Sequence, residues 1–126
     1  MTDRKPLTEL TDLQLGILNV LWENGEASAG EVHEALAEDL ARKTIGTLLA
    51  RLEQYGVVTH RTRGREFIYR AAVTRNEVRE ARVRNLARNL FAGDPVEMIN
   101  FALAGDEVAE GDLERLRAMI EAYRRQ

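Results

Sequence analysis

The spacing of apolar residues changes at Gly56 from a helical to a strand pattern, which constrains the fold of this 126-residue chain more than any other feature. Before Gly56, four apolar residues follow the i, i+3, i+4, i+7 spacing of one helix face: Ile45, Leu48, Leu49 and Leu52. After it, the stretches 57–62 and 66–71 alternate with period two. The sequence therefore predicts a helix over about 42–55 and then a β-hairpin whose core face carries Phe67, Tyr69 and Ala71.

Two shorter helices are predicted before this one, and each begins with a capping box. Thr11 to Gln14 opens a helix that ends at Asn24-Gly25, and Ser28 to Glu31 opens a short second helix. The residues expected to face the core from these two helices are Leu13, Ile17, Leu18, Leu21, Trp22, Val32, Ala35 and Leu36. Three short helices followed by a hairpin with a basic tip is the order of a winged helix-turn-helix domain.

Three more helices are predicted after the hairpin, over about 74–91, 95–103 and 112–124. They are amphipathic but too few to enclose a core, so we expect their apolar faces to pack against a second copy of the chain. The residues expected at this dimer contact are Leu86, Leu90, Phe91, Leu113, Leu116, Ile120 and Tyr123. The predicted fold is mainly α with a small β-hairpin: a winged helix-turn-helix domain over 1–73 and a helical dimerisation domain over 74–126.

Basic residues are concentrated in the middle of the chain, although its net charge is −3. Residues 1–40 carry two basic and nine acidic side chains, a net charge of −7. Residues 41–73 carry seven basic and two acidic ones, a net charge of +5, and residues 74–126 carry nine and ten, a net charge of −1. A basic centre between acidic and near-neutral flanks indicates a local surface that binds phosphate.

The predicted third helix and the hairpin tip carry the candidate DNA-binding residues. On the helix, Thr44 and Thr47 offer hydroxyl and methyl groups to base edges, on a face small enough to enter a major groove. Cations at both ends of that face and around Gly64 suit phosphate contacts or an adjacent minor groove. The predicted DNA-binding residues are Arg42, Lys43, Thr44, Thr47, Arg51, Arg61, Arg63 and Arg65. An ordinary solvated helix face and a basic turn that keeps an edge strand soluble remain the alternatives.

The sequence gives no sign of catalysis, metal binding or membrane insertion. His33 and His60 are the only histidines, and neither lies near a serine nucleophile, paired carboxylates or a phosphate loop. The chain has no cysteine, which excludes disulfides and thiolate metal sites, and no apolar stretch approaches the roughly 18 residues that cross a bilayer. We therefore expect no enzyme activity, no cofactor, no metal and no stable membrane association, in a cytoplasmic protein.

Three segments resemble the BlaI/MecI/CopY (penicillinase repressor) family of winged-helix regulators. Residues 44–56 match the family's recognition-helix pattern T-[IV]-x-T-L-L-x-R-L-x-x-x-G, and residues 10–22 are similar to its first helix, including the tryptophan. Residues 64–69 resemble its wing pattern G-R-x-[FY]-x-Y. The chain departs from the family at Gly46, where a polar residue is usual, and at Ala41, near which a hydroxyl residue is usual. These departures suggest a different operator sequence.

The resemblance implies a homodimer that binds a palindromic double-stranded operator and represses genes for β-lactam resistance, the cell wall or stress. It also implies that repression is relieved by cleavage of the C-terminal domain, prompted by a membrane sensor protease. Asn100-Phe101, within MINFAL, is similar to the cleavage site of one branch of the family and is the candidate scissile bond. The copper-responsive branch uses a cysteine-rich motif, which this chain lacks.

Two other functions remain open at the level of sequence. The first is a winged-helix repressor that senses a small molecule, so that ligand binding rather than cleavage shifts the dimer. The second is a winged helix that contacts another protein and binds no DNA.

Overall fold

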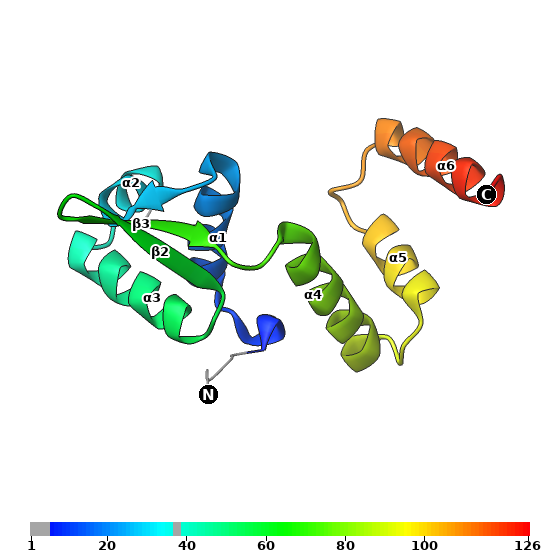
Figure 1. Ribbon diagram of the computed structural model, residues 1–126. Coiled ribbons are helices and arrows are strands. Elements are labelled where there is room, and N and C mark those ends of the chain that lie inside the picture. Colours follow the sequence, from blue (N-terminus) through cyan, green and yellow to red (C-terminus); the bar gives the residue numbers. More distant parts are fainter. Residues whose placement is uncertain (1–5, 37–38) are drawn as a thin grey trace. The chain divides into compact units, whose positions relative to one another are not determined.

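The computed structural model describes residues 6–36 and 39–126, and its elements alternate short helices with a small sheet before three C-terminal helices (Figure 1). In chain order they are η1 (Leu7–Glu9), α1 (Asp12–Asn24), β1 (Ala27–Ser28), α2 (Ala29–Ala35), α3 (Arg42–Gln54), β2 (Val58–Arg63), β3 (Glu66–Ala71), α4 (Arg75–Leu90), α5 (Pro95–Leu103) and α6 (Glu110–Arg124). The predicted fold class, mainly α with a small antiparallel sheet, is confirmed.

The capping boxes set the starts of α1 and α2 as predicted. The hydroxyl of Thr11 accepts from the Gln14 amide, and the Gln14 side chain accepts from the Thr11 amide in return. Ser28 and Glu31 make the same pair of bonds at α2. Gly25 ends α1 with φ 81°, a left-handed conformation that glycine adopts without a steric penalty.

The core of the N-terminal part is formed by one face each of α1, α2 and α3, together with the sheet. Its fully buried side chains are Ile17, Leu18, Leu21, Val32, Ile45, Leu49, Leu52, Val57 and Val58. Leu13, Trp22, Leu36 and Leu48 are half-buried. Ala35 is exposed, and its predicted core position is wrong. The helix ends there, because Leu36 has extended backbone angles (φ −81°, ψ 131°) and so leaves the helical phase.

The sheet has three antiparallel strands in the order β1-β3-β2, so the hairpin is flanked by a third strand that the sequence did not predict. β1 pairs Ala27 with Tyr69 and Ser28 with Ile68, which makes this part of β3 central. Ile68 and Tyr69 are therefore both buried. The prediction that Phe67 faces the core is wrong: it lies one residue beyond the β1 pairing and stays 48% exposed.

The chain divides into two compact units, one ending at Val83 and the other running from Arg84 to Gln126, so the boundary falls inside α4. This is further along the chain than the predicted boundary at residue 73. The reason is that the first half of α4 packs on the first unit, where Val78 is buried. Arg82 donates there to the carbonyl oxygens of Leu7 and Leu10. The assignment of DNA binding and dimerisation to separate domains remains a prediction.

The second unit contains the end of α4, α5 and α6. The amide of Gly93 donates to the carbonyl of Ala87 and closes α4, while the Asp94 carboxylate accepts from two amides at the start of α5. Helix α6 begins at Glu110, slightly before the predicted start. The Asp112 carboxylate accepts from the Ala109 amide and so lies inside the first turn.

Candidate nucleic-acid interface

Helix α3 presents the predicted reading face to solvent. Its opposite face is held by Ile45, Leu49 and Leu52, none of which is measurably exposed. Five of the predicted DNA-binding residues are exposed on or beside the free face: Arg42, Lys43, Thr44, Thr47 and Arg51. The burial of one face fixes the helix while leaving the other open to a ligand.

The Thr47 hydroxyl already has a partner within the helix. Its Oγ1 donates to the carbonyl oxygen of Lys43 at 3.1 Å, the back-bonding that threonine commonly makes in helices. The hydroxyl oxygen is left as an acceptor, and the methyl group is fixed beside it. In this rotamer Thr47 suits an amino group of adenine or cytosine, or the methyl group of thymine, in a major groove.

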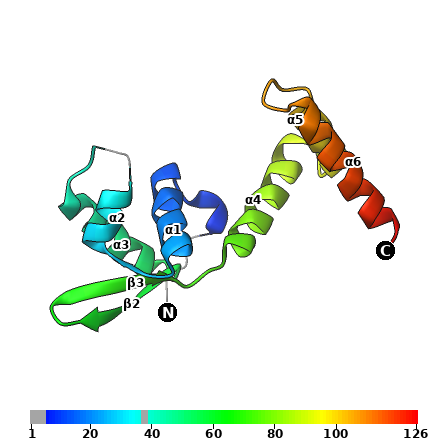
Figure 2. The same ribbon diagram turned by 90° about the horizontal axis from the view of Figure 1, so that it is seen from above.

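The hairpin between β2 and β3 forms the wing, and its tip is exposed. Gly64 has φ 63°, the left-handed conformation that the tight turn requires. One terminal nitrogen of Arg63 lies 3.6 Å from a carboxylate oxygen of Glu66, and both side chains are more than half exposed. This ion pair is therefore weak, and another anion can readily replace Glu66. In Figures 1 and 2 the tip projects on the side of the unit where α3 begins.

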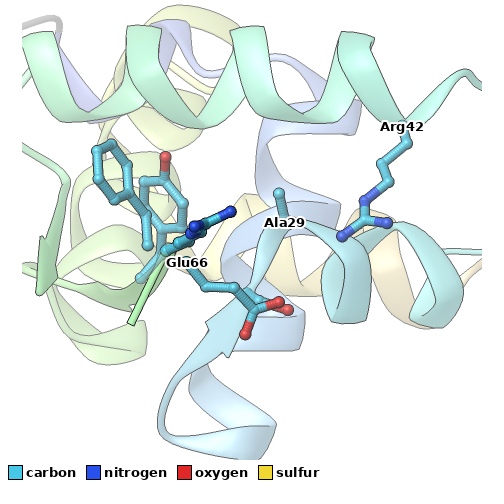
Figure 3. Close-up of a pocket in the computed structure, with 7 residues that line it drawn as sticks. Ala29, Arg42 and Glu66 are labelled. Carbon is cyan, nitrogen blue, oxygen red and sulfur yellow. The ribbon is translucent and has the colours of Figure 1, made fainter. Parts of the chain in front are cut away.

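A pocket of 320 Å³ brings the wing and the start of α3 together (Figure 3). Arg42 from α3 and Arg65 from the wing both line it, although they are far apart in sequence. Figure 3 shows Arg42 reaching toward α2, which carries Ala29, with Glu66 of the wing on the other side of the pocket. The Arg42 guanidinium lies so close to Gly30 that a β-carbon there would come within 2.6 Å of it. Gly30 thus leaves room for this arginine.

Arg61 does not join this group, because it is engaged by an acidic residue. Its Nε and one terminal nitrogen donate to the two carboxylate oxygens of Glu26 at 3.2 and 2.7 Å. The hydrogen bond from Arg61, with the charges of Arg61, Arg70 and Arg63, lowers the pKa of Glu26. Arg61 can therefore contact a DNA phosphate, as predicted, only if this bidentate ion pair opens.

A histidine ties the wing to the helix. The Nδ1 atom of His60 on β2 lies 2.7 Å from the carboxylate of Glu53 on α3. The Phe67 ring stacks on the same imidazole, with 4.1 Å between centroids and 21° between planes. Burial, followed by the charge of Glu53, raises the pKa of Tyr69 beside them. The exposed Phe67 thus stabilises the wing by stacking.

Sequence reasoning missed Glu26 and the wing contacts of Glu53. Glu26 precedes a two-residue strand that has no alternation to detect, and its partner is 35 positions away. Glu53 and His60 are seven positions apart, but a helix end and a turn separate them, so neither helix nor strand periodicity relates them. The one signal in the sequence was the presence of an acidic residue near the end of the predicted helix and a histidine in the following strand, which could form an ion pair across the turn.

The other predicted site residues lie in the second unit and are largely uncovered there. Leu86, Leu90, Leu113, Ile120 and Tyr123 are 42 to 71% exposed, while Phe91 and Leu116 are half-buried. Asn100 and Phe101 are both exposed, Phe101 by 71%. The centroids of the Phe101 and Phe91 rings are 5.8 Å apart. Across residues 6–36 and 39–126, no helix is long and apolar enough to cross a membrane.

The comparisons with known proteins agree with this geometry. The family model described as penicillinase repressor matches residues 10–122. The chain belongs to this family. A curated relative, the penicillinase repressor of Bacillus licheniformis, is 23% identical over 122 residues, covering 95% of each chain. The methicillin resistance regulatory protein MecI of Staphylococcus aureus (strain N315) is 21% identical over 114 residues, covering 89% of this chain and 93% of its own.

Two solved structures share the fold, and one of them is a repressor domain of more than 25% identity. The solution structure of the DNA-binding domain of the repressor BlaI superposes with a TM-score of 0.51 at 28% identity, covering 59% of this chain and 92% of its own. The YusO protein from Bacillus subtilis, at 21% identity and a TM-score of 0.51 over 77% of each chain, shares the fold. This member of the penicillinase repressor family is a DNA-binding transcriptional repressor and not an enzyme.

Proposed function

We propose that the chain binds a palindromic operator as a homodimer, with α3 in the major groove and the wing tip on the flanking backbone. One observation carries the proposal: Arg42 and Arg65, from α3 and from the wing, line one pocket beside the exposed face of Lys43, Thr44 and Thr47. Two cations that line one pocket at the start of this helix suit phosphates, while the threonines face bases. Such a repressor acts in the cytoplasm, where its operator lies.

The second unit supports the dimer. Large apolar side chains stay exposed on α4, α5 and α6, among them Leu90, Val96 and Ile120. A cluster of this kind is unusual on a monomer and marks a protein contact. Two-fold pairing would let the winged-helix units bind half-sites about one helical turn apart, roughly 34–36 Å. Deleting 101–126 removes α6 and the end of α5 and should give a monomer by light scattering. A truncated chain that stays dimeric would contradict this contact.

The DNA interface is tested by the salt dependence of operator affinity. In the double variant Lys43→Ala, Arg63→Ala, affinity should fall and the slope of log K against log salt should flatten by about two, since each lost phosphate contact releases one fewer counterion. Arg115→Ala in the second unit is the matched control, because its exposed guanidinium pairs with Asp112 and, among the described residues, with no other side chain. A double variant with wild-type affinity and slope would favour a winged helix that contacts protein instead.

We further propose that cleavage at Asn100-Phe101 ends repression. Both residues are exposed, and α5 is only nine residues long, so local unwinding would give a protease access to the bond. Loss of α6 would weaken the dimer and with it the two-site grip on DNA. Mass spectrometry of the chain after incubation with membranes from induced cells should find fragments 1–100 and 101–126. Derepression with an intact bond would instead favour a small-molecule sensor.

A further inference from the structure

A second pocket of 320 Å³ lies within the first unit, between α1 and the first half of α4. We propose that it binds a small apolar carboxylate, of the size of a single ring bearing one carboxyl group. Binding itself stands apart from the proposed function, whereas its effect on repression rests on that function.

One wall of the pocket is apolar and preorganised. Trp22 and Leu15 of α1 and Val78 of α4 line it, and Val78 is only 4% exposed. The Trp22 indole is held in place, since its Nε1 donates to the carbonyl oxygen of Val73 at 2.9 Å. A fixed aromatic wall favours a planar ligand, because little side-chain order has to be gained on binding.

The charge of the lining selects an anion. Three arginines of α4 line the pocket, and no carboxylate is among its lining residues. Arg75 donates to Glu23 at 3.0 Å and lies over the Trp22 ring, and Arg82 is bound to backbone carbonyls. Within the described part of the chain, Arg79 has neither hydrogen bond nor ion pair and is exposed. Its guanidinium can therefore hold a carboxylate through two parallel hydrogen bonds.

The size of the pocket limits the ligand. A volume of 320 Å³ is at the lower end of the roughly 300–1,000 Å³ of small-molecule sites. A benzoate or phenylacetate would place its ring against Trp22 and its carboxylate at Arg79. A neutral ring of the same shape would leave the arginines without a counter-charge, so it should bind less well.

The position of the pocket beside α4 would allow a bound ligand to change the affinity for the operator. One of its walls is α4, and this helix continues from the first unit into the second. A ligand seated between α1 and α4 would change the direction in which α4 leaves the winged helix. In a dimer this would alter the spacing of the two reading helices and thus the affinity for a two-site operator.

Trp22 is the only tryptophan of the chain, so its fluorescence reports on the pocket directly. Titration of the full-length protein with benzoate and phenylacetate, without DNA, should give a saturable change in emission. Benzamide should bind at least about ten-fold more weakly, and Arg79→Gln should weaken benzoate binding by a similar factor. Arg84→Gln, on the same helix but outside the pocket lining, should leave benzoate binding unchanged.

Three results of the titrations, and one control measurement, would overturn the proposal. The first is the absence of a saturable change with either acid, the second is equal binding of benzamide, and the third is an equal effect of Arg79→Gln and Arg84→Gln. If Trp22 emission instead shifts with protein concentration alone, a second copy covers the pocket and no ligand site exists. Since these titrations contain no DNA, they succeed or fail independently of operator binding. A separate titration of operator complexes with benzoate then tests the effect on repression.

Discussion

The Nδ1 atom of His60 lies 2.7 Å from each carboxylate oxygen of Glu53, so the wing strand β2 is bonded to the end of helix α3. Phe67 of β3 stacks on the same imidazole and extends the contact across the hairpin. The two elements that we propose read bases and contact the DNA backbone are thereby held in a fixed relation. Preorganisation of this kind reduces the ordering cost when both elements bind one ligand.

Replacing His60 by alanine should lower operator affinity more than it lowers stability. The His60 and Glu53 side chains are 28 and 34% exposed, so loss of their pair should reduce the free energy of unfolding by about 1 kcal/mol or less. Affinity should fall several-fold, because the wing loses its fixed orientation. Fluorescence anisotropy with operator DNA and urea unfolding measure the two quantities. Thr62→Ala, at an exposed position two residues along the strand, is the control, and wild-type affinity in His60→Ala would refute the coupling.

The ion pair between Glu26 and Arg61 should restrain DNA binding. Glu26→Gln removes the charge that holds Arg61, so the guanidinium becomes available to a phosphate. Operator affinity should rise, and the salt slope should steepen by about one. For the same reason Arg61→Ala should weaken binding less than Arg65→Ala does. Arg65 lines the pocket together with Arg42 and, within residues 6–36 and 39–126, has no carboxylate pair to break. Equal losses from the two arginine variants would show that Arg61 already contacts DNA.

The parts of the fold that local chemistry determines could be predicted, and those that depend on distant pairing could not. A capping box needs only residues three positions apart, so the starts of α1 and α2 followed from the sequence. β1 exists because Ala27 and Ser28 pair with residues about 40 positions later, and nothing in its two residues indicates a strand. The exposure of Phe67 depends on where that pairing stops.

The candidate site divides in the same way. The exposed face of α3 follows from helical spacing, which places Lys43 and Thr47 opposite Ile45 and Leu49. Spacing also groups Arg61 with Arg63 and Arg65 near the hairpin tip. Only the tertiary structure separates them, because Glu26 approaches β2 from the turn before β1. A cluster of charges in sequence is therefore not a cluster of free charges in space.

Gly46 offers a test of how closely α3 approaches DNA. It lies in the middle of the helix, and a β-carbon built there has no atom within 4 Å. Gly46→Ala should therefore stabilise the protein by up to about 1 kcal/mol, since alanine favours the helical backbone. If the glycine allows close approach to the groove, operator affinity should fall nonetheless. Thermal unfolding and anisotropy measure the two effects, and Ala50→Gly, at an exposed position one turn later, should lower stability.

If Gly46→Ala raises the melting temperature and leaves affinity unchanged, the position is merely tolerant and close approach is excluded. A fall in melting temperature would contradict the open space around Gly46. The two measurements thus separate the contribution of this residue to the helix from its contribution to the DNA interface.

Glu31 should make the stability of the first unit depend on acid pH. The backbone amide of Ser28 donates to its carboxylate, and this bond, with the Ser28 side chain, lowers the pKa of Glu31 below its ordinary value of 4.5. A group whose pKa is lowered by folding stabilises the fold at pH values above its pKa in the unfolded chain. That stability is lost as the pH falls through its pKa in the folded chain. In Glu31→Gln the amide oxygen can still accept from Ser28, as the Gln14 side chain does for Thr11 at α1, but it cannot titrate.

The urea midpoint of the wild-type chain should therefore lie above that of Glu31→Gln at pH 7, fall more steeply between pH 5 and 3, and approach it at the acid end. Glu34→Gln is the matched control: Glu34 is exposed on the same helix and makes no hydrogen bond in the described part of the chain, so its removal should leave the wild-type pH profile unchanged. Parallel profiles for the wild type and Glu31→Gln would mean that the carboxylate contributes no more than a neutral acceptor at the start of α2. Because both capping boxes have the same geometry, the difference between the two profiles isolates the charge of Glu31 from its hydrogen bond.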